Sequence, residues 1–146
     1  MSADLFNTTF EISLRLLLLL SVSADPLDLD TLVCLDLFVT NAKEYGFGDE
    51  NLNGDGLCPR ESAGHRRKVF RAGIAELSGQ GLVNVVSDKN GISYSINLFG
   101  QIAVGDFDSD YAKEYEALAR RVLAACDGVD RRVLLRKAGY YGRDGK

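Results

Sequence analysis

Histidine, cysteine and long apolar runs are all scarce in this chain, and each scarcity excludes a class of protein. The 146 residues include one His and three Cys. Cys34, Cys58 and Cys126 are odd in number and far apart, so neighbouring cysteines cannot form a zinc knuckle or a redox pair. We therefore expect reduced thiols in a cytoplasmic protein, with no metal centre and with Cys34 in the core. His65 stands beside three basic residues, a setting more typical of a surface than of a catalytic site.

The apolar run at residues 16–20 is too short to cross a membrane, which takes roughly 20 apolar residues. A cleaved signal peptide is the alternative, because residues 22–24 resemble a small-residue cleavage site. However, Asp4 and Glu11 stand where such a leader would be basic. We therefore expect a helix buried on most of its faces and no membrane association.

A net positive charge is also missing. The formal charge of −4 argues against a protein dominated by nonspecific nucleic-acid binding. The charge is unevenly distributed: ten acidic and two basic residues up to Cys58 give −8, and fifteen basic and eleven acidic residues from Pro59 give +4. An anionic partner would therefore contact the second half of the chain.

Motifs for catalysis and nucleotide binding are absent from the sequence. The glycines at 46–48 and 79–81 lack the strand–helix setting and the following Lys of a phosphate loop. Helix capping and solvation explain the acidic pair Asp28 and Asp30 better than acid–base catalysis does. We therefore expect neither an enzyme nor a cofactor.

The most informative local pattern is a helix followed directly by a β-hairpin. An amphipathic helix is expected over about 61–78, and strands are expected over 82–87 and 92–97. Asn90 and Gly91 suit the positive φ angles of the turn between the strands. This order predicts an α+β, mainly helical fold: a winged helix-turn-helix with a two-stranded wing and additional C-terminal helices.

Further helices follow from capping and breaking residues. Thr8 and Glu11 form a capping box for a helix over 9–22. A second helix is expected to be capped by Asp25, to start at Pro26 and to run to about residue 45, where Gly46 ends it. Later helices are expected over 98–104, 111–126 and 130–137. We divide the chain into a winged-helix domain at 1–105, a C-terminal helix packed on it at 106–128, and a basic, partly flexible tail at 129–146.

The loop at residues 49–54 resembles the opening of a calcium-binding EF-hand loop. Its oxygen donors alternate and a Gly stands at the sharp turn. The twelfth position should be a bidentate Glu, but it is Arg60, and Glu61 comes one residue late. A flexible polar loop is the better interpretation, and a calcium-binding module is the weaker alternative.

The candidate residues for binding nucleic acid or a protein partner are basic and come from the third long helix, the hairpin turn and the tail. They are Arg66, Arg67, Lys68, Arg71, Lys89, Arg131 and Arg132. The helix could contact phosphates or base edges in a major groove. The alternatives are an acidic protein partner or a solvated face, and for the tail either docking or terminal disorder.

Several blocks of the sequence together resemble a bacterial family. They are LFNTTFEISLRLL at 5–17, LDLD at 27–30, DENLNGD at 49–55, RR at 66–67, GLV at 81–83 and YAKEY at 111–115. In these blocks the chain is similar to the middle component of ABC-three-component systems, although residues 63–65 are less apolar than in that family.

The resemblance implies a non-catalytic adaptor that works beside a coiled-coil ABC ATPase and an effector subunit. Such systems, including Lamassu-like ones, are associated with anti-phage defence, and double-stranded DNA is a further expected ligand of the complex. A dimeric winged-helix transcription regulator is the alternative function. A salt-sensitive, sequence-specific gel shift would distinguish the regulator from the adaptor.

Overall fold

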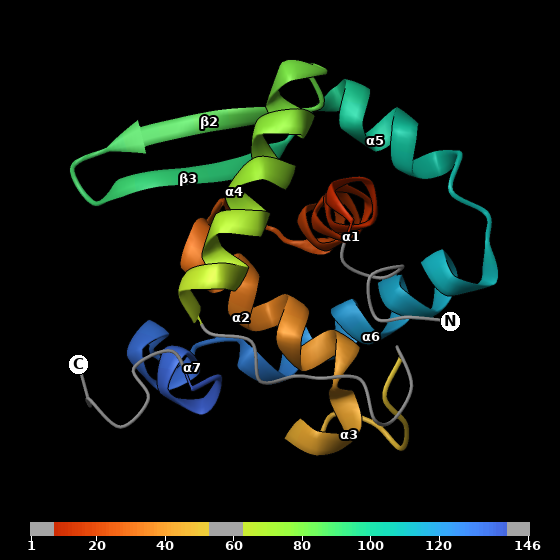
Figure 1. Cartoon of the computed structure of the whole chain (residues 1–146), viewed down its shortest axis with the longest axis vertical. Helices are drawn as coiled ribbons and strands as arrows, with labels where there is room; N and C mark the ends of the chain where they lie inside the picture. The colour runs from red at the N-terminus through yellow and green to blue at the C-terminus, as the bar shows by residue number, and fades with distance from the viewer. Residues whose placement is uncertain (1–7, 53–62, 140–146) are drawn as a thin grey trace.

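Seven helices and three short strands make up the part of the chain that the computed structural model describes, residues 8–52 and 63–139 (Figure 1). The fold is therefore mainly helical α+β, as predicted. In chain order the elements are α1 (Thr9–Val22), β1 (Leu27–Asp28), α2 (Leu29–Thr40), α3 (Ala42–Tyr45), α4 (Ala63–Gly79), β2 (Val83–Asp88), β3 (Gly91–Ile96), α5 (Leu98–Gly105), α6 (Asp110–Cys126) and α7 (Arg131–Lys137).

Helix α1 lies at the centre of the fold, with α4, α5 and α6 around it (Figure 1). It has the predicted bounds and cap, because the Thr8 side chain accepts a hydrogen bond from the Glu11 amide. Every residue from Arg15 to Leu20 is buried, so the prediction of a helix covered on most faces is confirmed. Gly73 lets α4 approach closely, since a Cβ there would lie 3.1 Å from Cγ2 of Ile12.

Helix α2 begins later than predicted. The expected cap at Asp25 and start at Pro26 are wrong, because the next two residues form β1, which pairs Leu27 with Tyr94 on β3. The cap is Asp28, whose side chain accepts from the Thr31 amide. An edge strand therefore takes the residues that local capping rules assigned to a helix.

The predicted second helix is also broken near its end. Asn41 leaves the helical region with φ −121° and ψ 43°, and it separates α2 from α3. Its side-chain amide donates to the carbonyl oxygen of Leu37, a local bond of the kind that competes with helix continuation. Gly46 then ends α3 in the left-handed conformation, as predicted, with φ 81°.

Helix α4 and the hairpin have the predicted order, and the strands lie within one residue of their predicted bounds. The predicted start of α4 at 61 or 62 lies outside the described residues. The turn differs in detail: Gly91 has φ 118°, but no described non-glycine residue, including Asn90, has a positive φ. The sheet order is β1-β3-β2, and all its strand pairs are antiparallel.

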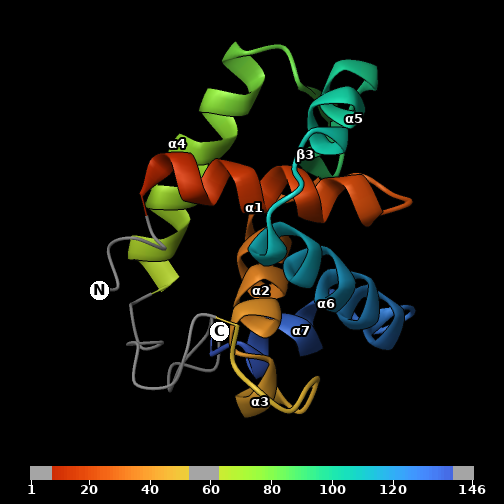
Figure 2. The same cartoon turned by 90° about the vertical axis from the view of Figure 1, so that its right-hand side faces the viewer.

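The C-terminal helices complete the fold below α1 (Figure 2). Ser109 caps α6, which packs on α1 and α2. Helix α7 packs on α2 and buries Leu134 and Leu135. Within the described residues, no helix is long and apolar enough to cross a membrane.

Candidate interaction surface

A groove of about 720 Å³ brings together four elements that are distant in sequence. Its walls come from the start of α2, from α4, from the distal half of the β2–β3 hairpin and from α7. Arg67, Arg71 and Arg131 line it together with Asp28 and Asp30. The groove therefore combines basic residues from the predicted set with acidic residues that the prediction assigned to capping and solvation.

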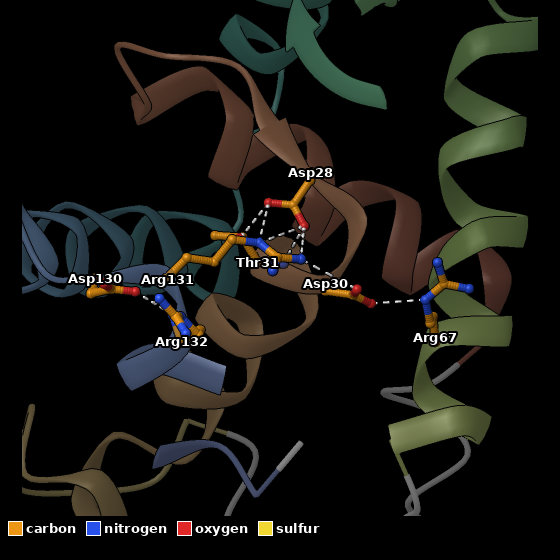
Figure 3. Close-up of polar contacts among 7 residues, drawn as sticks. All are labelled: Asp28, Asp30, Thr31, Arg67, Asp130, Arg131 and Arg132. Carbon is orange, nitrogen blue, oxygen red and sulfur yellow. Dashed lines mark hydrogen bonds and ion pairs between the residues drawn. The ribbon is translucent and has the colours of Figure 1, made fainter. Parts of the chain in front are cut away.

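Asp28 holds α7 against the start of α2. Its carboxylate accepts from the Arg131 guanidinium, with a shortest distance of 2.8 Å from Nη2 to Oδ2 (Figure 3). The same carboxylate accepts from the backbone amide and the hydroxyl of Thr31. One side chain thus caps α2 and anchors a helix that lies more than a hundred residues further along the chain.

Asp30 connects this contact to α4. Its Oδ1 accepts from Nε of Arg67 at 2.8 Å, and its Oδ2 lies 3.4 Å from Nη2 of Arg131 (Figure 3). The two aspartates and two arginines therefore form a continuous network across α4, α2 and α7. We call these four residues the acid–base bridge.

The electrostatics of Asp28 follow from its partners. Burial alone would raise the pKa of this carboxyl, but hydrogen bonds from Arg131 and Thr31 and the charge of Arg131 outweigh burial. The net effect is a pKa below the ordinary value of 3.8. Asp28 is therefore ionised wherever the protein is folded near neutral pH.

The other predicted basic residues lie outside the bridge. Arg66 is half-buried on α4, and Lys68 and Arg71 are exposed on the same helix. Lys89 lies at the tip of the hairpin. On α7, the Arg132 backbone amide donates to the carboxylate of Asp130 at 2.8 Å (Figure 3).

Among the predicted basic residues, Arg67 and Arg131 are thus engaged by carboxylates of the same chain. Such pairs leave less positive charge for an external anion than the sequence suggests. The sequence did carry a signal for this arrangement, since Asp28 and Asp30 flank the start of a helix and belong to the negatively charged half of the chain.

The comparison with protein families identifies the chain. The family model of the ABC-three component (ABC-3C) system Middle Component 2 matches residues 5–138. The chain belongs to this family. No curated protein and no solved structure matches it. The acid–base bridge lies wholly within the part of the chain that the Middle Component 2 family covers.

The core of this Middle Component 2 chain holds a second polar network, which was not predicted from the sequence. Arg15 of α1 donates to Asp36 of α2 through Nε at 2.9 Å and Nη2 at 3.1 Å, and the hydroxyl of Tyr115 on α6 donates to Asp36 Oδ1 at 2.7 Å. All three side chains are buried. The available signal was one charged residue in the apolar middle of each helix, Arg15 in α1 and Asp36 in α2.

Burial alone would lower the pKa of Arg15, but the charge of Asp36 beside it raises that pKa above its ordinary value. Burial and the charge of Asp36 both raise the pKa of Tyr115. The guanidinium therefore stays charged and the phenol stays protonated, so the phenol can donate to the carboxylate. This network ties α1, α2 and α6 together in the centre of the Middle Component 2 fold.

Within residues 8–52 and 63–139, no group of three His, Cys, Asp or Glu side chains is placed so that it could hold a metal ion. The later part of the calcium-like loop, including Arg60 and Glu61, lies outside those ranges, as does Cys58. Cys34 is fully buried, so the prediction that it lies in the core is confirmed.

Proposed function

We propose that this chain is a non-catalytic adaptor subunit that joins a coiled-coil ABC ATPase to an effector subunit in anti-phage defence, in the cytoplasm. The observation that carries the proposal is membership of a family of middle components over residues 5–138. A middle component belongs to an assembly of several proteins, so a protein interface is the first function to expect of it.

We also propose that the fold is a winged helix-turn-helix. Helix α4 occupies the place of the recognition helix, and the β2–β3 hairpin that follows it occupies the place of the wing. The pairing of β1 with β3 supports this assignment, because it anchors the middle of β3 to the segment between α1 and α2. The wing then projects away from the helices (Figure 1).

The acid–base bridge supports a protein-contact role over autonomous DNA binding. DNA affinity comes chiefly from cations that neutralise phosphates. Arg67 and Arg131 already neutralise Asp30 and Asp28, and the whole chain is net negative at −4. We therefore assign DNA binding to the assembled complex. Lys68, Arg71 and Lys89 would contribute phosphate contacts to that binding.

A dimeric transcription regulator is the alternative, and the exposed positions of Lys68 and Arg71 on α4 favour it. A free dimer that shifts one DNA sequence specifically, with a steep dependence on salt, would support the regulator. An adaptor should show weak and sequence-independent binding on its own.

The test of the adaptor is affinity purification of the tagged chain from its native host, followed by mass spectrometry. Recovery of a coiled-coil ABC ATPase in stoichiometric amount is the expected result. Recovery of the chain alone, as a dimer, would overturn the proposal in favour of the regulator.

A further inference from the structure

Helix α5 exposes three large apolar side chains next to one another. Leu98, Phe99 and Ile102 are 72%, 67% and 60% exposed. Positions 98 and 102 are one helical turn apart and 99 is adjacent, so all three share one side of the helix. The whole helix, LFGQIAVG, contains no charged residue. A contiguous apolar surface of this kind marks an interaction site more often than a scattered exposed leucine does.

The backbone beneath this apolar face is held firmly. Gly100 packs so closely on the hairpin that a Cβ there would lie 2.3 Å from the carbonyl oxygen of Leu82. Asn97 caps the helix by accepting from the Gly100 amide at 2.9 Å, and its side-chain amide donates to the Gly81 carbonyl oxygen at 2.9 Å. Eight residues would scarcely form a helix alone in water. Tertiary contacts therefore fix α5, and the apolar face is presented already organised for binding.

The segment that follows this apolar face is acidic. Asp106 and Asp108 follow α5 directly and are exposed. The only basic residue between Glu76 and Lys113 in the sequence is Lys89, and it stands at the hairpin tip, far from α5 (Figure 1). Asp106 is the C-cap of α5, where a negative charge opposes the helix dipole, so helix stability does not explain its presence.

We propose that the α5 apolar face docks an apolar segment of another component of the same system, one flanked by lysines or arginines. This inference rests on the proposed adaptor function and assigns a surface to it. The apolar side chains would supply the buried centre of the interface, and Asp106 and Asp108 would attract the basic flanks.

The acidic segment disfavours two other occupants. Two copies of this chain packed through α5 would offer Asp106 and Asp108 no basic residue from that helix, because a two-fold interface places one patch against itself. An anionic membrane surface would be repelled by both carboxylates. A partner with basic flanks gains from the charges that hinder the other two.

The test uses the purified full-length chain and, separately, the purified ABC ATPase and effector components. Phe99→Gln removes the central aromatic of the apolar face. Phe10→Gln is the matched control, because Phe10 is also 67% exposed but stands at the start of α1, away from α5 (Figure 2). We expect Phe99→Gln to weaken binding to one component by about 30-fold, as for an interface hot spot. Phe10→Gln should leave the affinity within about twofold of wild type.

Charge gives an independent readout. Asp106→Lys should slow association at low salt, and the difference from wild type should disappear in high salt as the charges are screened. Circular dichroism and thermal unfolding of each variant should match wild type, because the altered side chains are exposed. If Phe99→Gln were to unfold, Ile102→Gln and Asp106→Lys would still test whether the α5 apolar face binds the partner.

The outcomes separate this inference from the proposed function. Binding of wild type and Phe99→Gln with equal affinity would overturn the α5 assignment and leave the adaptor intact. Binding of wild type to neither component would overturn both. A dimer in sedimentation, or binding to phosphatidylcholine–phosphatidylglycerol vesicles, that Phe99→Gln abolishes would replace the proposed partner with a second copy or a membrane.

Discussion

Asp28 shows at the scale of one residue how capping and ion pairing can be combined. Its side chain caps α2 through Thr31 and pairs with Arg131 on α7. The local rules of helix capping could have placed an Asp at the start of α2, although they pointed to Asp25. They could not have found Arg131, because sequence spacing carries no information on a contact between residues 103 apart.

The two roles of Asp28 can be separated by substitution. Asp28→Asn keeps a capping oxygen and removes the charge, whereas Asp28→Ala removes both. We expect Asp28→Asn to lower the free energy of unfolding by at most about 1 kcal/mol, as for an exposed ion pair. Asp28→Ala should cost about 1 kcal/mol more, because the cap is also lost. Urea unfolding at neutral pH measures both values, and equal losses would contradict the capping role.

The pH dependence of stability follows from the depressed pKa of Asp28. A folded pKa below the ordinary value of 3.8 means that the unfolded state binds the proton more readily. The stabilisation is therefore complete above pH 3.8 and is lost as the pH falls through the lower folded pKa. Asp28→Asn should remove this part of the acid dependence, and the two unfolding curves should converge in acid.

The buried network should be far more sensitive than the exposed one. Asp36→Asn leaves the guanidinium of Arg15 buried without its countercharge, so we expect a loss of about 3–5 kcal/mol. Tyr115→Phe removes one donor to the carboxylate and should cost about 1–3 kcal/mol. Thermal unfolding ranks the two variants, and a milder effect of Asp36→Asn would contradict a charged buried pair.

Cys34 should be nearly inert toward thiol reagents. Burial, followed by the charges of Asp30 and Asp28, raises the pKa of its thiol to about 12. The reactive thiolate is therefore scarce at neutral pH. We expect Cys34 to react with iodoacetamide much more slowly than the half-buried Cys126, and peptide mass spectrometry of a time course would measure both rates. Comparable rates in the folded protein would contradict the packed core around α2.

Elements with their own caps and periodicity were predictable from the sequence. Helices α1, α5 and α6 begin at or within one residue of the predicted positions, because Thr8, Asn97 and Ser109 each supply a local cap. The hairpin was predictable from its alternation and its turn glycine. Strand β1 was not, because a two-residue edge strand has no periodicity and exists only through its pairing with β3.

The position of α5 depends on one glycine. Gly100→Ala should destabilise the protein by about 1–3 kcal/mol or displace α5, because the new methyl group would meet the Leu82 carbonyl oxygen. Gly105→Ala in the same helix is the control, since nothing lies within 4 Å of a Cβ there. Equal loss of thermal stability in the two variants would contradict the close contact between α5 and the hairpin.

At the scale of the whole molecule, the uneven charge of the sequence is partly cancelled in the fold. The acidic first half supplies Asp28 and Asp30, and the basic second half supplies Arg67 and Arg131, so the acid–base bridge joins the two halves. The sequence predicted a basic surface from the second half alone. It could not show that the fold would place carboxylates from the first half against it.

Reversing the charges of Lys68, Arg71 and Lys89 together should weaken DNA capture by the assembled complex and leave the fold intact, because all three side chains are exposed. Each lost phosphate contact should also reduce the salt dependence of binding by about one unit in log–log slope. Charge reversal at Lys113, which is exposed on α6, is the control. A large loss of thermal stability in the triple variant would show that the three basic residues stabilise the fold instead.

The most direct test of the adaptor is the mass of the species that forms when the purified chain is mixed with the ABC ATPase component of its system. Light scattering after size-exclusion chromatography measures that mass. The adaptor function predicts a stable complex that contains both proteins in a fixed ratio. Separate elution of the two proteins, with this chain as a dimer that binds one DNA sequence specifically, would contradict it.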